Sequence, residues 1–182
     1  MTDTHTESLS IEARAALVQR SIEIMADGEL EDFVEIVHPQ ATNREAIDEP
    51  PDCRGRGPEA LLATARWLRR AFAELRWDIH DTVVQDDLVA VHCTMHGRQV
   101  GPFVTYDDDG QVERAFPPTG RTFATTQSHW FRIADGLVIE HWANRDDMGM
   151  ATQLGWIPPT PAFLVRSARA TRRARRELQR AQ

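Results

Sequence analysis

The sequence contains no lysine, and all 21 of its basic residues are arginine. This absence excludes a Schiff-base lysine, a pyridoxal phosphate anchor and a phosphate-loop lysine. The two cysteines, Cys53 and Cys93, form no motif, so neither a disulfide framework nor a cysteine-based zinc site is expected. The chain also lacks a phosphate-cradling glycine motif, and nothing in it calls for a nucleotide, flavin or haem. We therefore expect no cofactor.

Long apolar runs are absent as well, and none could cross a bilayer. The polar N-terminus, Met1 to Ser8, lacks the charged-then-apolar pattern of a signal peptide, which favours a cytoplasmic location. A length of 182 residues suits one domain, and 41% hydrophobic with 27% charged residues is an ordinary globular balance.

The net charge of −7 is unevenly distributed. Residues 161–182 hold seven arginines and one glutamate, a local charge of +6, so the rest carries −13, the difference between −7 and +6. An acidic body is a poor partner for nucleic acid, whose phosphates dominate affinity. The basic tail is predicted to be a helix that is either solvated or packed on a neighbouring subunit.

Helical periodicity dominates the first part of the chain. Apolar residues from Ile11 to Met25 recur every three or four positions, which predicts a helix ending at Asp27-Gly28. A second short pattern, Leu30 to Val37, stops at His38-Pro39, and the polar stretch 40–56 is predicted to be a loop. Pro58 then opens another helix, whose apolar stripe runs from residue 61 to Leu75.

After Arg76 the period changes to two, which is typical of strands. The predicted strands span residues 76–84, 88–97, 98–106, 121–134 and 137–143, and Asp107 to Gly110 is an expected loop tip. Helices followed by antiparallel strands indicate an α+β fold, a curved sheet wrapped on the N-terminal helices with a cavity at its concave face. We expect a flexible segment over 1–9, one domain over 10–157 and the arginine-rich tail over 158–182.

The hairpin around Asp135-Gly136 decides which side chains enter that cavity. A type I turn with Gly136 in a left-handed bulge places His129 and His141 on one face, together with Gln127 and several apolar residues. The expected pairs are Ile133 with Leu137, Phe131 with Ile139, and His129 with His141. A plain two-residue turn would instead put the two histidines on opposite faces.

Histidines also recur on the strand at 88–97. His92, Thr94 and His96 share one of its faces, which is either pocket or solvent, while the opposite face is apolar and belongs to the core.

An ordered set of motifs is similar to the SnoaL-like polyketide cyclase and ester cyclase family. The matching segments are His38-Pro39 with Asn43, Phe116 to Arg121, His129 to Gly136, Glu140-His141-Trp142, Asp146 to Met150, and Gln153-Leu154-Gly155. The resemblance covers roughly residues 11 to 156. It implies a nuclear transport factor two-like cone with one enclosed pocket, a homodimer or homotetramer, and an intramolecular aldol ring closure of a small apolar carbonyl-containing metabolite, without metal or cofactor.

Ring closure needs a proton removed from a carbon beside a carbonyl, and an enolate stabilised. His129 and His141 suit both tasks. Where the family's antibiotic cyclases carry a catalytic aspartate, two residues after His141, this chain has Ala143. Asp146 is the nearest carboxylate in the family pattern and is the third catalytic candidate, although a helix N-cap is its other interpretation.

The expected substrate-binding residues are Asn43, His96, Gln127 and Phe131, although Asn43 is also a natural turn residue. The histidines are open to a simpler interpretation too, as hydrogen-bonded pocket walls, or with His96 as three nitrogen ligands of a metal. Two other functions stay open. One is an epoxide hydrolase using Asp146, Arg145 and Asn43, and the other is a non-catalytic binder, which Ala143 favours.

Overall fold

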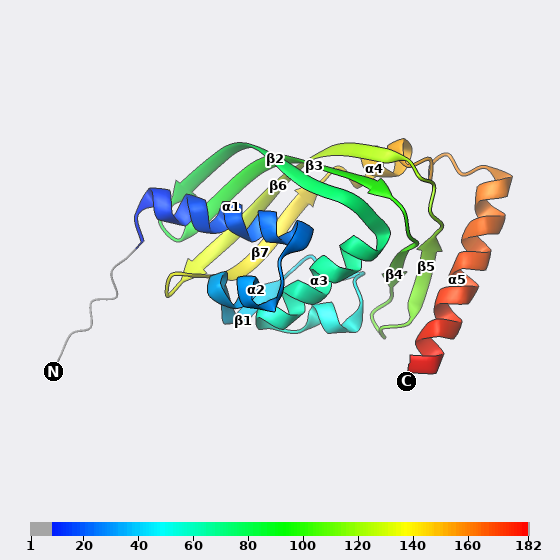
Figure 1. Ribbon diagram of the computed structural model, residues 1–182, viewed down its shortest axis with the longest axis horizontal. Coiled ribbons are helices and arrows are strands. Elements are labelled where there is room, and N and C mark those ends of the chain that lie inside the picture. Colours follow the sequence, from blue (N-terminus) through cyan, green and yellow to red (C-terminus); the bar gives the residue numbers. More distant parts are fainter. Residues whose placement is uncertain (1–8, 182) are drawn as a thin grey trace.

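The computed structural model of the chain describes residues 9–181 (Figure 1). Of the segment 1–9 that was predicted to be flexible, all but Leu9 lies outside the described residues. The helices are α1 (Ile11–Asp27), α2 (Leu30–Ile36), the short 3-10 helix η1 (Pro51–Arg54), α3 (Gly57–Ala71), α4 (Asp147–Gln153) and α5 (Pro161–Ala181). The strands are β1 (Val37–Asn43), β2 (Phe72–Gln85), β3 (Leu88–Gln99), β4 (Phe103–Tyr106), β5 (Val112–Phe116), β6 (Thr122–Ala134) and β7 (Leu137–Arg145).

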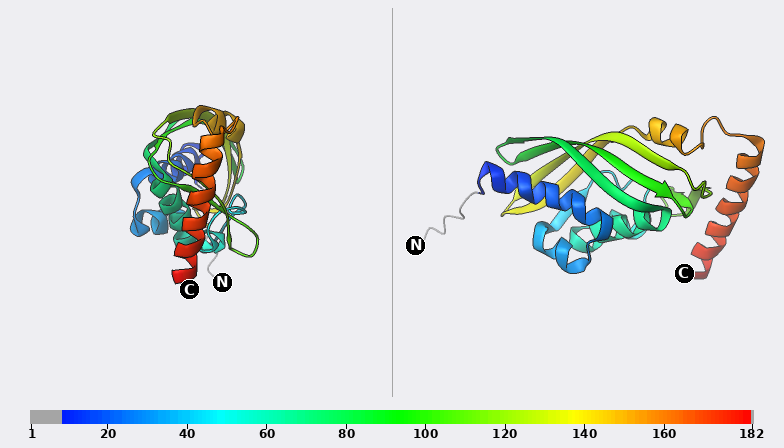
Figure 2. Two further views of the ribbon diagram at one scale, coloured as in Figure 1. Left: turned by 90° about the vertical axis from the view of Figure 1, so that its right-hand side faces the viewer. Right: turned by 45° about the horizontal axis from the view of Figure 1, so that its top comes forward.

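The predicted α+β class is confirmed. Five strands form one curved sheet in the order β1-β7-β6-β3-β2, in which only β1 and β7 run parallel. Helices α1, α2 and α3 lie together on one face of this sheet, while β4, β5 and α5 stand at its far end (Figures 1 and 2). The concave face therefore has a helical cover along part of its length, and the space between the two layers is where the pocket forms.

The apolar face of β3 packs into the core, as predicted. Val89, Val91 and Cys93 are buried with Val18 and Ile22 of α1. At the other end of the sheet a second cluster joins Phe72, Met95, Phe123, Leu154, Trp156 and Phe163. Apolar packing thus closes both ends of the space between helices and sheet.

The third helix ends earlier than its apolar stripe predicts. Phe72 and Leu75, expected on α3, lie in β2. The carbonyl of Ala71 accepts hydrogen bonds from the backbone amides of Val100 and Gly101, at 2.9 and 3.0 Å, and Phe72 pairs with Gln99 of β3. Strand pairing with a distant segment therefore replaces the helical hydrogen bonds at this point, which a local period cannot show.

Two more predictions were wrong. The stretch 40–56, predicted to be a loop, begins inside β1, which pairs with β7 through contacts nearly 100 residues apart. The stretch 98–106, predicted to be one strand, is interrupted after Gln99, and β4 pairs with the unpredicted β5 instead. The expected loop tip from Asp107 to Gly110 is confirmed, since Gly110 N donates to Asp107 O at 2.9 Å.

The hairpin of β6 and β7 has a different register from the predicted one. Asp135 and Gly136 both have positive φ, 52° and 77°, which makes a two-residue type I′ turn that pairs Ala134 with Leu137. A bulge follows, because Ile133 pairs with Val138 and Arg132 with Glu140, leaving Ile139 as the extra residue. The pairs are thus His129 with Ala143 and Phe131 with His141. The bulge shifts β7 by one residue. His129 and His141 therefore lie on the same face of the sheet, as diagonal neighbours rather than as a directly opposite pair.

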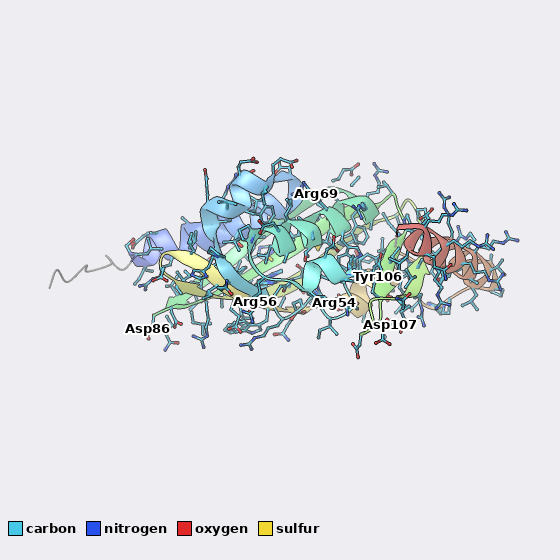
Figure 3. All side chains as sticks on the ribbon, turned by 90° about the horizontal axis from the view of Figure 1, so that it is seen from below. Arg54, Arg56, Arg69, Asp86, Tyr106 and Asp107 are labelled. Carbon is cyan, nitrogen blue, oxygen red and sulfur yellow. The ribbon has the colours of Figure 1, made fainter. Side chains whose placement is uncertain are left out.

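Arg69 of α3 holds the carboxyl end of α1 (Figure 3). Its guanidinium donates to the carbonyl oxygens of Ile24, Met25 and Gly28 at 2.6, 3.0 and 2.9 Å. The carbonyl of Ile24 also accepts the backbone amide of the C-cap residue Gly28 at 2.8 Å. Because the last turn of a helix leaves carbonyl acceptors without helical donors, the Arg69 guanidinium supplies donors at this end of α1.

Replacing Arg69 with alanine is expected to lower the free energy of unfolding by about 2–3 kcal/mol, since hydrogen bonds from charged donors are worth more than neutral ones. Urea unfolding measures this loss. The exposed neighbour Arg70→Ala is the control and should change stability by less than about 0.5 kcal/mol. Equal effects of the two substitutions would contradict this role of Arg69.

The arginine-rich tail forms α5, which packs against β5. Ser167 Oγ donates to the carbonyl of Ala115, and the amide of Ala115 donates to Thr171 Oγ1, both at 2.9 Å. No helix within residues 9–181 is long and apolar enough to cross a membrane.

Candidate functional site

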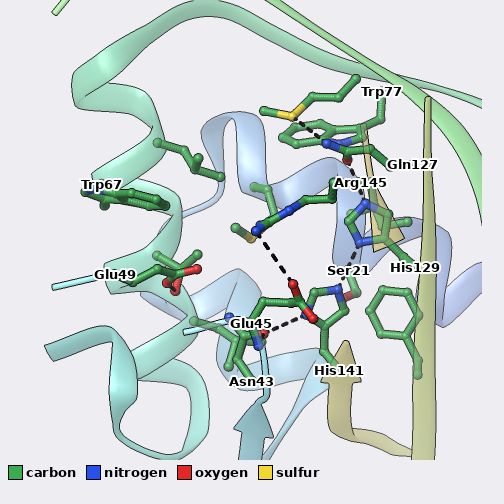
Figure 4. A pocket seen from close by; sticks show the side chains of 17 residues that line it. Ser21, Asn43, Glu45, Glu49, Trp67, Trp77, Gln127, His129, His141 and Arg145 are labelled. Atoms are coloured by element: carbon green, nitrogen blue, oxygen red, sulfur yellow. Dashed lines mark hydrogen bonds and ion pairs between the residues drawn. The ribbon is translucent and has the colours of Figure 1, made fainter. Parts of the chain in front are cut away.

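A pocket lies between the helices and the concave face of the sheet (Figure 4). Its empty space, counted together with the open solvent at its mouth, is about 700 Å³. Its walls are largely apolar, with Ile22 and Met25 from α1, Leu61 and Trp67 from α3, and Phe131 from β6. Polar side chains interrupt these walls at Ser21, Asn43, Glu45, Glu49, Thr64, Gln127, His129, His141 and Arg145. A mainly apolar surface into which several polar side chains converge is typical of a small-molecule site.

The two histidines are joined in a chain of hydrogen bonds along the sheet wall of the pocket. His129 Nδ1 lies 2.9 Å from His141 Nε2. The outer nitrogens reach side-chain amides, since His129 Nε2 lies 2.8 Å from Gln127 Oε1 and His141 Nδ1 lies 2.9 Å from Asn43 Oδ1. All four ring nitrogens take part in these three contacts.

At each end of this chain of hydrogen bonds the terminal atom is an acceptor oxygen. Trp77 Nε1 donates to Gln127 Oε1 at 3.3 Å, and the backbone amide of Glu45 donates to Asn43 Oδ1 at 3.1 Å, which sets the orientation of each amide. Each of the three contacts needs one hydrogen atom to become a hydrogen bond, and the two terminal amide oxygens carry none. The two neutral imidazoles together carry only two N–H hydrogens. The chain therefore has one unfilled proton position.

Burial keeps that third proton off. It lowers the pKa of His129 to about 4, and Arg145 adds to this effect. The pKa of His141 is lowered well below its usual value by burial, then by His129 and Arg145. Both rings are thus neutral at pH 7, and each can offer an N–H or a lone pair to a bound molecule.

Two carboxyl groups line the same pocket and differ in their surroundings. Glu45 accepts a hydrogen bond from the backbone amide of Ala143 at 3.0 Å and lies 3.6 Å from the Arg145 guanidinium. Glu49 is only 2% exposed, and Thr64 Oγ1 donates to its Oε2 at 2.5 Å. Burial raises the pKa of Glu49 to about 7, an effect that Thr64 and Arg145 partly oppose.

The loop that carries Glu49 is tied to the β4–β5 hairpin by Arg54 (Figure 3). The Arg54 guanidinium donates to the carbonyl of Glu49 at 3.1 Å and to the carbonyl of Asp107 at 2.8 Å. These contacts anchor the segment 49–54 to a hairpin that is more than 50 residues away in sequence.

A second pocket adjoins the first and shares five lining residues with it: Trp67, Leu68, Met95, Gln127 and Arg145. It encloses about 1000 Å³, including open space, and Phe103, Phe116 and Trp156 line it. Arg145 stands at the boundary, 3.6 Å from both Glu45 and Asp147. The two pockets are therefore contiguous at these shared residues.

Five residues predicted from the sequence meet in the first pocket, namely Asn43, Gln127, His129, Phe131 and His141. His96 is not among them: the structure places it on the opposite face of β3, with Nε2 2.8 Å from Asp78 Oδ2. Successive residues of a strand point to opposite faces of the sheet. Cys93 and Met95 are buried in the core, so His96, which follows Met95, faces outward.

Asp146, the third catalytic candidate, lines neither pocket. Its carboxylate accepts a hydrogen bond from the amide of Gly149 at 2.8 Å and caps α4, as its simpler interpretation held. The three-histidine metal site does not form, because His96 lies across the sheet from the other two. Within residues 9–181 no three His, Cys, Asp or Glu side chains are grouped to hold a metal ion.

Comparison with known proteins decides the family. The family model for the SnoaL-like polyketide cyclases matches residues 15–154. The chain belongs to the SnoaL-like polyketide cyclase family. It is 33% identical over 149 residues to the aklanonic acid methyl ester cyclase DnrD of Streptomyces peucetius, which covers 80% of this chain and 92% of DnrD. It is 29% identical to the nogalonic acid methyl ester cyclase of Streptomyces nogalater, over 70% of this chain and 87% of that protein.

Among solved structures, this SnoaL-like chain resembles TsrD from Streptomyces laurentii, with a TM-score of 0.65 and 26% identity over 81% of this chain and 98% of TsrD. The relatives support a polyketide cyclase-like enzyme. At the position of the family's catalytic aspartate this SnoaL-like enzyme has Ala143, which contributes only its backbone amide to Glu45. The pocket's own carboxyl groups are Glu45 and Glu49. Sequence reasoning missed both, because they lie in an aperiodic segment that gives no local signal.

Proposed function

We propose that this enzyme is a cofactor-free cyclase that closes a ring by intramolecular aldol chemistry in a polyketide-like ester. The observation that supports this best is the His129–His141 pair, neutral and hydrogen-bonded on one wall of an enclosed apolar pocket. A mainly apolar pocket strengthens a hydrogen bond offered to a developing charge, which is what enolate formation requires.

In this proposal the histidine pair donates a hydrogen bond to the enolate oxygen of the substrate. Each end of the chain already holds an acceptor oxygen, Gln127 Oε1 or Asn43 Oδ1. An enolate oxygen that replaces one of them accepts the ring N–H in its place. Phe131, whose ring centroid lies 4.9 Å from that of His141, supports the pair and supplies apolar contact to the substrate.

The proposal is tested by incubating the purified protein with polyketide methyl esters, and the names of the relatives make aklanonic and nogalonic acid methyl esters the first choices. Aldol closure moves one proton and forms one carbon–carbon bond, so the product has the mass of the substrate but a different chromatographic and ultraviolet profile. Tight retention of the esters without any such product would support a non-catalytic binder instead and overturn the proposal.

His129→Ala and His141→Ala are each expected to lower kcat by about 10²–10³, the usual cost of losing a donor to a developing oxyanion. The matched control is His92→Ala, which removes a histidine from the outer face of the same sheet, where it lies 3.5 Å from Asp81. Steady-state kinetics on the cyclised ester measures all three variants. Wild-type turnover in either pocket variant would show that the pair only lines the wall.

We also propose, from the sequence and its resemblance, that the enzyme works in the cytoplasm as a homodimer or homotetramer.

A further inference from the structure

We propose that Glu49 is the carboxyl group that takes the proton from the substrate carbon and returns it to the new oxygen. This inference rests on the proposed cyclase function. It assigns the acid–base step to a side chain on the wall opposite the histidines, in place of the residue at position 143 that lacks a carboxyl group.

The geometry favours Glu49 over the other carboxyl groups near the pocket. Figure 4 shows Glu49 beside α3 and the His129–His141 pair on the sheet, on opposite walls of the pocket, with the ion pair of Arg145 and Glu45 drawn between them. A molecule lying in this space contacts the carboxyl group on one side and the imidazoles on the other. Proton removal and enolate stabilisation then act on the same substrate from two sides.

Glu45 is less suited to this task. It is held by the amide of Ala143 and by Arg145, and both contacts favour its ionised form. Arg145 forms ion pairs with Glu45 and Asp147, each at 3.6 Å. Asp146 caps α4 outside the pocket.

The surroundings of Glu49 also allow it to carry either protonation state. Burial raises its pKa to about 7, where a general acid–base is most effective. The groups that act on it come from several elements: Thr64 of α3, Arg145 of β7 and Cys53 of η1 favour the charged form, and Asp48 opposes it.

The reaction balances without another reagent. Ionised Glu49 takes the proton as the substrate C–H bond breaks, and the electron pair forms an enolate whose oxygen accepts a histidine N–H. The enolate carbon then attacks the second carbonyl carbon, forming the ring bond and moving the carbonyl π electrons onto oxygen. That alkoxide takes the proton back from the Glu49 carboxyl, which restores the carboxylate.

Glu49→Gln separates this role from a structural one, because the amide oxygen can still accept the Thr64 hydrogen bond but the side chain cannot exchange a proton. We expect kcat to fall by about 10²–10⁴ with KM within threefold, and Glu49→Asp to recover part of the rate. In D₂O, exchange of the substrate's acidic carbon-bound proton should fall in parallel. Glu59→Gln, an exposed substitution in the first turn of α3, is the control and should match the wild type.

If the wild type cyclises the ester and Glu49→Gln does so within threefold of its rate, the assignment of Glu49 is overturned while the cyclase function stands. If the wild type cyclises no ester, the cyclase function falls, and a second measurement still tests Glu49. In protein labelled with ¹³C at the glutamate carboxyl, one signal that is absent from Glu49→Gln should titrate near pH 7 and shift when the methyl ester binds. A signal that titrates near pH 4.5 or does not respond to the ester overturns the inference.

Discussion

Protonation of His129 is expected to remove about 3 kcal/mol of this protein's free energy of unfolding as the pH falls from 7 to 4, a loss that protonation of Glu49 in the folded state opposes. Burial lowers the pKa of His129 from 6.5 to about 4, and one pKa unit corresponds to about 1.4 kcal/mol. The folded-state pKa lies below the unfolded one, so the unfolded chain takes up protons first. The stability is therefore fully present above pH 6.5 and is lost as the pH falls through 4. His141, whose pKa is also lowered, adds to the loss.

Urea unfolding at pH 7.5, 6, 5 and 4 measures this dependence. His129→Gln should lose less of its free energy of unfolding between pH 6 and pH 4 than the wild type, because the amide does not titrate. His92→Gln on the outer face should lose as much as the wild type. Glu49 and the other acidic groups are present in all three proteins, so the comparison between variants isolates the contribution of His129. The same loss of unfolding free energy between pH 6 and pH 4 in wild type and His129→Gln would show that this histidine is already solvated in the folded state.

Glu49→Gln is expected to stabilise the protein above pH 7, by an amount on the order of 3 kcal/mol at pH 8.5. Burial raises the pKa of Glu49 from 4.5 to about 7, so the folded state holds its proton after the unfolded chain has lost it. The stability conferred by the neutral carboxyl is complete below pH 4.5 and is lost as the pH rises through 7. Glutamine does not ionise and avoids the cost of a buried charge.

At pH 5 the same substitution should change stability little, since Glu49 is protonated there in the folded state. Thermal or urea unfolding at pH 5 and pH 8.5 tests the expected stability change at each pH, and Glu59→Gln is again the exposed control. Destabilisation by Glu49→Gln at pH 8.5 would mean that ionised Glu49 has a favourable partner, and its role as a proton carrier would lose support.

These two effects have a common cause. The pocket holds the buried carboxyl group of Glu49, which accepts a hydrogen bond from Thr64, and a part-buried pair of histidines with one proton too few for its contacts. Both arrangements are costly away from water. Apolar residues of similar size would make this region more stable. Polar groups that are costly to stability and meet around one cavity are typical of a functional site.

Much of this protein follows from its sequence. Repeats of three and four predicted α1 and α3, and alternation predicted β2, β3, β6 and β7, because these elements bury one face and their side chains record it. The motif set pointed to the family, and the two histidines with Asn43, Gln127 and Phe131 do line one pocket.

The tertiary structure alone decided the rest. Strand β1 exists only because β7 pairs with it, and the register of the β6–β7 hairpin depends on a bulge at Ile139 that no local pattern marks. His96 faces outward because its neighbours fill the core. Glu49 enters the pocket because Arg54 and Thr64 hold its loop there. Sequence periodicity reports which face of an element is buried, whereas contacts between distant segments determine which polar groups meet.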